Sequence, residues 1–108
     1  MDRKKQERAP FVEALEGYCQ QHLKAYHTPG HKLGQGISAY QASLFGDALR
    51  RDLGVMYALD DLFQPEGALK EAMDLAADLY GAGRTFFSIN GTTACIEAMI
   101  LAVCGDGD

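Results

Sequence analysis

Hydrophobic residues recur every three or four positions along the first half of the chain, which is the spacing of an amphipathic helix. A first helix is predicted over about 4–25, with Pro10 near its start because proline is tolerated only in a first turn. Whether the residues before Pro10 are helical is left open by the pattern. Its apolar positions are Phe11, Val12, Leu15, Tyr18, Cys19 and Leu23. A second helix is predicted over about 38–51, with Ser38 as its cap. The side chains expected to face inward from it are Tyr40, Leu44, Phe45, Ala48 and Leu49.

The clearest helical pattern lies further along, over about 68–80, where one face is apolar and Gly81 fits as the stop. The segment 84–89 is short, aromatic and β-branched, and it predicts a strand. After a short turn, residues 92–103 predict a fourth helix with Glu97 as its only charge. A helix that is apolar nearly all round is expected to be buried on every side.

A strand, a turn, a buried helix and a loop in this order are the opening of a βαβ unit. The second strand of that unit is missing from the sequence, which therefore looks truncated. We expect an α/β parent fold, of which this chain is a mostly α-helical part with one short extended segment. Without the rest of the sheet, the polypeptide is expected to be marginally stable and to self-associate, or to need the rest of the domain.

Composition narrows the class of protein. The 108 residues include 10 basic and 15 acidic side chains, and the formal net charge is -5. This length allows one small domain or a piece of a larger one, and the acidic balance argues against nucleic-acid binding. No apolar run is long enough to cross a membrane, and the charged N-terminus lacks the apolar core of a secretory signal.

The three cysteines, Cys19, Cys95 and Cys104, are an odd number and form no CxxC pair. This pattern is neither a disulfide framework nor a zinc site, and it favours a reducing compartment, the cytoplasm. Cys95 and Cys104 lie in an apolar stretch, so they are predicted to be packing residues.

The strongest candidate for chemistry is the turn Asn90-Gly91-Thr92-Thr93 between the predicted strand and the last helix. A helix N-terminus with free N–H groups, a glycine and two hydroxyls suits an anion such as phosphate. The alternative is an ordinary helix cap, since Thr and Asn cap helices routinely. The turn lacks the glycines of a dinucleotide fingerprint and the lysine of a P-loop, so neither NAD nor ATP is supported.

A second candidate is the loop HTPGHK, which contains His27, His31 and Lys32. Pro29 and Gly30 between the two histidines exclude a helical metal-binding pair, and no third ligand is apparent, since His22 belongs to the predicted first helix. The loop is interpreted as an anion-binding or active-site wall, or as a simple solvated loop.

A third candidate is the adjacent pair Asp60 and Asp61 within the segment 59–67. Neighbouring carboxylates can act as acid and base, but on an irregular chain they usually point apart. The favoured interpretation is that one of the two fixes a turn by accepting hydrogen bonds from backbone N–H groups.

Five segments of the chain occur in an order that is typical of one family. They are HTPGHKLG from His27, the stretch from Phe45 to Asp52, LDDLFQPEG at 59–67, the stretch from Ala76 to Ala82, and TFFSINGTT at 85–93. Together they resemble the beginning of the major domain of the Orn/Lys/Arg decarboxylases, enzymes with the aspartate-aminotransferase fold that use pyridoxal phosphate (PLP). The resemblance covers nearly everything from 27 to 108.

The resemblance implies a PLP fold type I large domain with a mostly parallel seven-stranded sheet, of which 84–89 is the first strand. It implies that Gly91, Thr92 and Thr93 receive the PLP phosphate. The HTPGHK loop is similar to a family segment near the active site and the subunit contact. No catalytic role is assigned to a residue of that loop.

The resemblance also implies a domain organisation and a function. Residues 1–36 are expected to form an N-terminal helix and the HTPGHK loop, and 37–108 the beginning of the PLP-dependent domain. The complete enzyme is expected to be a homo-oligomer that decarboxylates arginine, lysine or ornithine in polyamine biosynthesis.

In this family the lysine that binds PLP covalently comes later in the chain, and Lys32 does not match its context. We therefore expect no catalytic residue and no activity in these 108 residues alone. The alternative function is a non-catalytic helical protein that binds a partner, such as a decarboxylase subunit.

Overall fold

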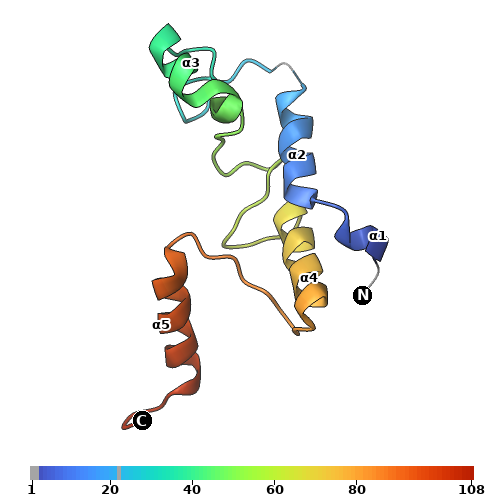
Figure 1. Ribbon diagram of the computed structural model, residues 1–108, viewed down its shortest axis with the longest axis vertical. Helices are drawn as coiled ribbons and strands as arrows, with labels where there is room; N and C mark the ends of the chain where they lie inside the picture. Colours follow the sequence, from blue (N-terminus) through green and yellow to red (C-terminus); the bar gives the residue numbers. More distant parts are fainter. Residues whose placement is uncertain (1–2, 22) are drawn as a thin grey trace.

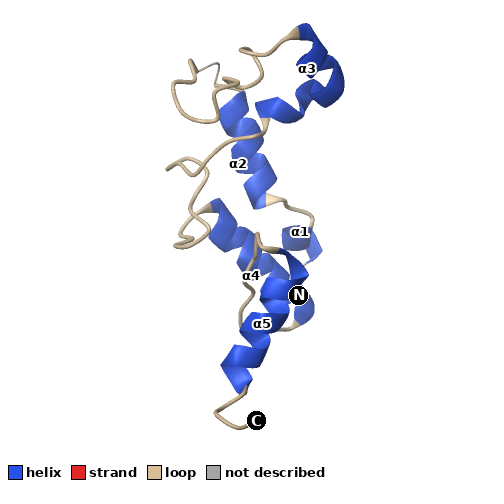
Figure 2. Ribbon diagram, turned by 90° about the vertical axis from the view of Figure 1, so that its left-hand side faces the viewer, coloured by secondary structure: helices blue, strands red, loops and turns tan. Residues whose placement is uncertain are grey.

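The computed structural model describes residues 3–21 and 23–108 and is elongated, with extents of 55 × 37 × 24 Å. Its elements are α1 (Arg3–Gln6), α2 (Pro10–Cys19), α3 (Ala39–Phe45), the 3-10 helix η1 (Gly46–Arg50), α4 (Ala68–Tyr80) and α5 (Gly91–Val103), as Figure 1 shows. The described part of the chain contains no strand, as the colouring of Figure 2 makes plain. No helix formed by these residues is long and apolar enough to cross a bilayer.

The core lies where α2 packs against α4. Its buried apolar side chains come from both helices and from the loops around them: Cys19, Ala25, Leu33, Leu59, Met73 and Ala77. The side-chain amide of Gln6 donates to the Leu75 carbonyl at 2.9 Å, and Arg8 pairs with both Glu13 and Glu71. These contacts hold the N-terminal segment on α4, although exposed ion pairs of this kind contribute little stability.

The single first helix predicted over 4–25 is wrong, because proline interrupts it. Pro10 is the first residue of α2, and Ala9 before it has φ −126° and ψ 75°, outside the helical region. The ring of a proline disfavours helical backbone in the preceding residue, so α1 ends before this point. At its other end α2 stops at Cys19 rather than near Ala25. The position of Pro10 in the first turn is confirmed.

The second predicted helix is present only in part. Ser38 caps α3 as predicted: its hydroxyl accepts from the Gln41 N–H while the Gln41 side chain accepts from the Ser38 N–H, a capping box. The α-helix ends at Gly46, whose φ of 51° is left-handed, and the chain continues as the 3-10 helix η1. Two contacts tie η1 and the next residue to α2: the Cys19 thiol donates to the Arg50 carbonyl at 3.0 Å, and Arg51 pairs with Glu16 at 2.5 Å.

The inward orientation predicted for the apolar residues of α3 is wrong. Tyr40, Leu44 and Phe45 are 72%, 60% and 52% exposed. The physical reason is that α3 projects from one end of the molecule, where, among the helices that the structure describes, it packs mainly on η1 (Figure 1).

The third predicted helix is confirmed with its bounds. α4 runs from Ala68 to Tyr80 and ends at Gly81, which has φ 64° and ψ 28°. A left-handed residue in this position lets the N–H groups after the helix bond back to its last carbonyls, and glycine adopts it without strain.

The segment 84–89 is irregular and pairs with no neighbour, so it forms no strand in the described chain. The helix after it, α5, begins one residue earlier than predicted and stands apart from the α2–α4 core in Figure 1. Cys95 and Cys104 are exposed, so their prediction as packing residues is wrong. Burial needs a second surface, and no other helix covers α5 in the part of the chain described.

Purified residues 1–108 are expected to self-associate through α5 and the segment before it. Phe86, Leu101 and Val103 are 75%, 81% and 81% exposed, and burying an apolar side chain of this size contributes about 1.5–3 kcal/mol. Size-exclusion chromatography with light scattering measures the association. Leu101→Lys should reduce it, whereas the matched variant Tyr57→Lys, at an exposed site outside α5, should leave it unchanged. A monodisperse wild-type monomer with a sharp cooperative melt would contradict this expectation.

Candidate functional site

The turn at the start of α5 combines a left-handed glycine with two exposed threonines. Gly91 has φ 76°, a left-handed conformation that favours glycine. A Cβ at this position would meet no heavy atom within 4 Å, so the backbone is open to an approaching group. Thr92 and Thr93 are both exposed.

Asn90 occupies the N-cap position of α5 without a side-chain hydrogen bond to the helix. The first N–H groups of a helix have no partner within it, and the helix dipole adds a partial positive charge there. The turn can therefore offer backbone N–H groups and two hydroxyls to an anion, which fits a phosphate group.

The HTPGHK loop is fixed to α2 through its first histidine. His27 Nδ1 lies 2.9 Å from the Thr28 carbonyl oxygen, and His27 Nε2 lies 3.0 Å from the Tyr18 hydroxyl. The two rings are inclined at 56° with their centroids 6.0 Å apart. Both ring nitrogens of His27 are thus engaged within the protein.

The second histidine of the loop, His31, is fixed to Asp52, which lies two residues after the end of η1. His31 Nε2 lies 3.1 Å from a carboxylate oxygen of Asp52, and His31 Nδ1 accepts from the Gly34 N–H at 3.2 Å. The His31 side chain is only 12% exposed. Lys32 and Leu33 both have left-handed backbone, with φ 51° and 56°; Lys32 is exposed, whereas Leu33 is buried.

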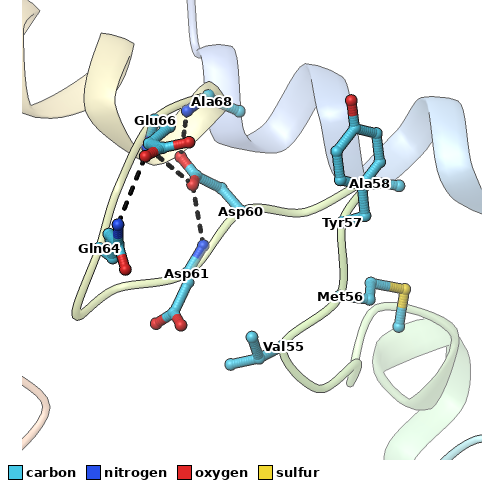
Figure 3. Close-up of a pocket in the computed structure, with 10 residues that line it drawn as sticks. Val55, Met56, Tyr57, Ala58, Asp60, Asp61, Gln64, Glu66 and Ala68 are labelled. Carbon is cyan, nitrogen blue, oxygen red and sulfur yellow. Dashed lines mark hydrogen bonds between the residues drawn. The ribbon is translucent and has the colours of Figure 1, made fainter.

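The Asp60 carboxylate accepts hydrogen bonds from five backbone N–H groups. Its Oδ2 accepts from the N–H groups of Gly67, Leu69 and Lys70 at 2.8, 2.9 and 3.3 Å, at the start of α4. Its Oδ1 accepts from the N–H groups of Asp61 and Glu66, and Figure 3 shows these bonds at the two ends of the loop that joins them. Asp60 therefore caps α4 from outside the helix and closes the loop 60–67.

These bonds set the charge state of Asp60. Desolvation by burial raises the pKa of Asp60, but the backbone N–H groups of Glu66, Asp61, Gly67 and Lys70 lower it by more, to about 2 from an ordinary 3.8. A carboxylate that accepts several N–H bonds is stabilised in its charged form. Asp60 therefore holds no proton at neutral pH that it could give to a substrate.

The prediction that one of the paired aspartates fixes a turn is confirmed, and both do so. Asp61 Oδ1 accepts from the Phe63 N–H at 2.8 Å, while Asp60 closes the longer loop. A pocket opens beside them, with Val55, Met56 and Tyr57 along one wall (Figure 3). Both carboxylates accept hydrogen bonds from backbone N–H groups, so Asp60 and Asp61 stabilise the loop 60–67.

The structure does not bring the candidate residues into one site. The HTPGHK loop lies near α3 and the C-terminal end of α2, well above the start of α5 in Figure 1. Among residues 3–21 and 23–108, no three His, Cys, Asp or Glu side chains gather as metal ligands would. His22 lies outside the described residues.

The sequence did not predict the roles of Tyr18 and Asp52, which hold the HTPGHK loop. It predicted a turn at Asp60 or Asp61 but not that Asp60 also caps α4. Tyr18 and Asp52 carry no local signal in the sequence. Tyr18 lies 9 positions from His27, and Asp52 lies 21 positions from His31. Asp60 had a signal. The N-cap of α4 is Gly67, which has no side chain, so the exposed N–H groups of that helix require an acceptor from elsewhere.

Similar proteins identify the family. A family profile described as "Orn/Lys/Arg decarboxylase, major domain" matches residues 9–108. Arginine decarboxylase of Bacillus anthracis is 44% identical over 109 residues, which cover 100% of this chain and 22% of that protein. Inducible ornithine decarboxylase of Escherichia coli is 36% identical, covering 94% of this chain and 15% of its own length.

Lysine decarboxylase of Pseudomonas aeruginosa is 38% identical, and the match covers 92% of this chain and 14% of that protein. No solved structure matches. The chain thus spans about a fifth of the length of its first curated relatives and corresponds to one part of such proteins. Because the profile match extends over nearly all of its residues, the chain belongs to the Orn/Lys/Arg decarboxylase family, within the region of the major domain.

Proposed function

We propose that this chain is the N-terminal part of a PLP-dependent decarboxylase that acts on a basic amino acid, with arginine as the favoured substrate. The observation that carries the proposal is the profile match over residues 9–108. Arginine is favoured because the relatives named arginine decarboxylase are 41–45% identical to the chain, whereas those named for ornithine or lysine are 31–38% identical.

The cofactor phosphate is proposed to bind at Gly91, Thr92 and Thr93. The uncapped N-terminus of α5, the open backbone at Gly91 and the exposed hydroxyls support this role. When bound, PLP supplies the electron sink for the pair of electrons that remains on the substrate as CO₂ leaves. The contribution of the three residues is to hold and orient an anion.

The remaining parts of the proposal concern architecture. The parent fold is PLP fold type I, an α/β fold in which 84–89 becomes the first strand of the sheet. Residues 1–36 carry the N-terminal helices and the HTPGHK loop, and 37–108 begin the cofactor domain; the packing of α2 on α4 joins these two parts. The loop with His27, His31 and Lys32 borders the active site and the contact between subunits of a homo-oligomer, which works in polyamine biosynthesis.

The proposal is tested with the complete reading frame that contains these residues. The purified protein, supplied with PLP, is expected to release CO₂ from arginine with a higher kcat/KM than from lysine or ornithine. Residues 1–108 alone are expected to release none, because they span about a fifth of the relatives' length and enclose no site around Thr92.

Two results would overturn the proposal. One is a complete protein that binds PLP but decarboxylates none of the three amino acids. The other is a reading frame that ends at Asp108 and yields a stable product that binds a decarboxylase subunit, which would support the alternative of a non-catalytic partner. Preference for lysine or ornithine would overturn only the choice of arginine.

A further inference from the structure

The two histidines of the HTPGHK loop are held by different acceptors and donors, and these determine where each imidazole carries its proton. A neutral imidazole has one N–H donor and one acceptor nitrogen, and the partner of each nitrogen decides between the two tautomers. In this loop each histidine has partners at both nitrogens.

For His31 the assignment follows from the backbone. The Gly34 N–H is a donor and cannot accept, so His31 Nδ1 must be the unprotonated nitrogen of that bond, 3.2 Å away. The proton is therefore on Nε2, which faces the Asp52 carboxylate at 3.1 Å and donates to it. The low exposure of this side chain, 12%, leaves little room for water to replace either partner.

For His27 the same logic gives the opposite tautomer. The Thr28 carbonyl only accepts, so His27 Nδ1, 2.9 Å away, carries the proton. Nε2 is then an acceptor, and the Tyr18 hydroxyl at 3.0 Å donates to it. This is the less common tautomer, since a free histidine side chain in water prefers its proton on Nε2.

We infer that Tyr18 and Asp52 are positioning residues that hold His27 as the Nδ1–H tautomer and His31 as the Nε2–H tautomer. The histidines connect the loop to α2 and to the chain after η1. The loop is further fixed by the buried side chain of Leu33. Lys32, exposed beside this anchor, is left as the side chain that the loop presents for ionic contacts.

This inference rests on the proposed function only in placing the loop beside an active site. The tautomers themselves depend on contacts within residues 18–52, and they can be read without PLP or substrate. A negative result therefore leaves the proposed decarboxylation untouched, and the failure of decarboxylation leaves the tautomers untouched.

Solid-state NMR of residues 1–108 labelled with ¹⁵N-histidine tests the inference, because it distinguishes protonated from unprotonated ring nitrogens and tolerates self-association. The chain has three histidines, and single substitution by glutamine assigns the signals. At a pH above the ordinary titration range of histidine, we expect Nδ1–H for His27 and Nε2–H for His31.

Variants then separate positioning from simple packing. Tyr18→Phe keeps the ring but removes the donor, so the signal of the unprotonated Nε2 of His27 should shift, while the Nδ1–H that faces the Thr28 carbonyl and the His31 signals stay unchanged. Asp52→Ala should shift the Nε2 signal of His31 and leave His27 unchanged. An Nε2–H tautomer for His27 in the wild type, or a His27 spectrum that ignores Tyr18→Phe, would overturn the inference.

Discussion

Replacing Asp60 by asparagine is expected to speed hydrogen exchange in the segment 60–70 by about 100-fold. One carboxylate accepts five backbone N–H bonds there, and hydrogen bonds to a charged group contribute about 1.5–3 kcal/mol each without being additive. A total loss of about 2–3 kcal/mol corresponds to roughly two powers of ten in the opening equilibrium. Asparagine is the appropriate substitute because Asp60 has φ 72°, a left-handed conformation that asparagine tolerates.

The matched control is Asp61→Asn. Asp61 is the neighbouring carboxylate, and within the described residues it accepts one hydrogen bond, from the Phe63 N–H at 2.8 Å, so its replacement should change exchange by less than about tenfold. Mass spectrometry of peptides from 60–70 measures both variants and does not require a monomer. Equal effects of the two substitutions would show that Asp60 has no special part in holding the loop.

The same interaction predicts how local stability depends on pH. The pKa of Asp60 is about 2 in the folded chain and 3.8 ordinarily, so the folded state favours the charged form. A lowered pKa gives stability that is present above about pH 4 and is lost as the pH falls toward 2. The difference between wild type and Asp60→Asn should therefore shrink by about 2 kcal/mol across this window.

The structure also shows which features can be derived from sequence in this chain. α4 and the capping box at Ser38 were predictable because their signals are local: an apolar stripe, a glycine stop, and a Ser–Gln pair three residues apart. The role of one aspartate in the segment 59–67 was predictable for the same reason, since turn-forming carboxylates act on nearby N–H groups.

Features that depend on distant partners were not predictable. The apolar residues of α3 have helical spacing, but spacing does not tell whether a second surface exists, and here Tyr40 is exposed. The exposure of Leu101 on α5 agrees with the expectation that these 108 residues offer little surface to cover a helix that is apolar nearly all round. The break before Pro10 could have been predicted, because a proline restricts the backbone of the residue before it, here Ala9, and this effect is local. The helical spacing of the apolar residues does not show such a break. The partners of His27 and His31 come from other segments and leave no trace in the loop's own sequence.

The largest functional effect is expected at the start of α5, in the complete protein. Replacing both Thr92 and Thr93 by valine should raise the Kd for PLP about 100-fold while the fold is retained. Valine keeps the shape and the β-branch of threonine and removes only the hydroxyl. Each lost hydrogen bond to a charged phosphate is worth about 1.5–3 kcal/mol, and the backbone N–H groups of the helix remain to bind the anion.

Equilibrium titration of the cofactor-free protein with PLP measures this effect, and circular dichroism checks the fold. Thr85→Val is the matched control, since Thr85 has the same side chain but lies in the irregular segment before the turn. It should bind PLP as the wild type does. An unchanged Kd in the double variant would show that the Asn90–Thr93 turn acts only as the beginning of a helix. If Thr85→Val raised the Kd as much as the double variant, the loss would come from the packing of the whole segment. A phosphate bound at the N-terminus of α5 would be affected by the Thr92 and Thr93 substitutions and not by Thr85→Val.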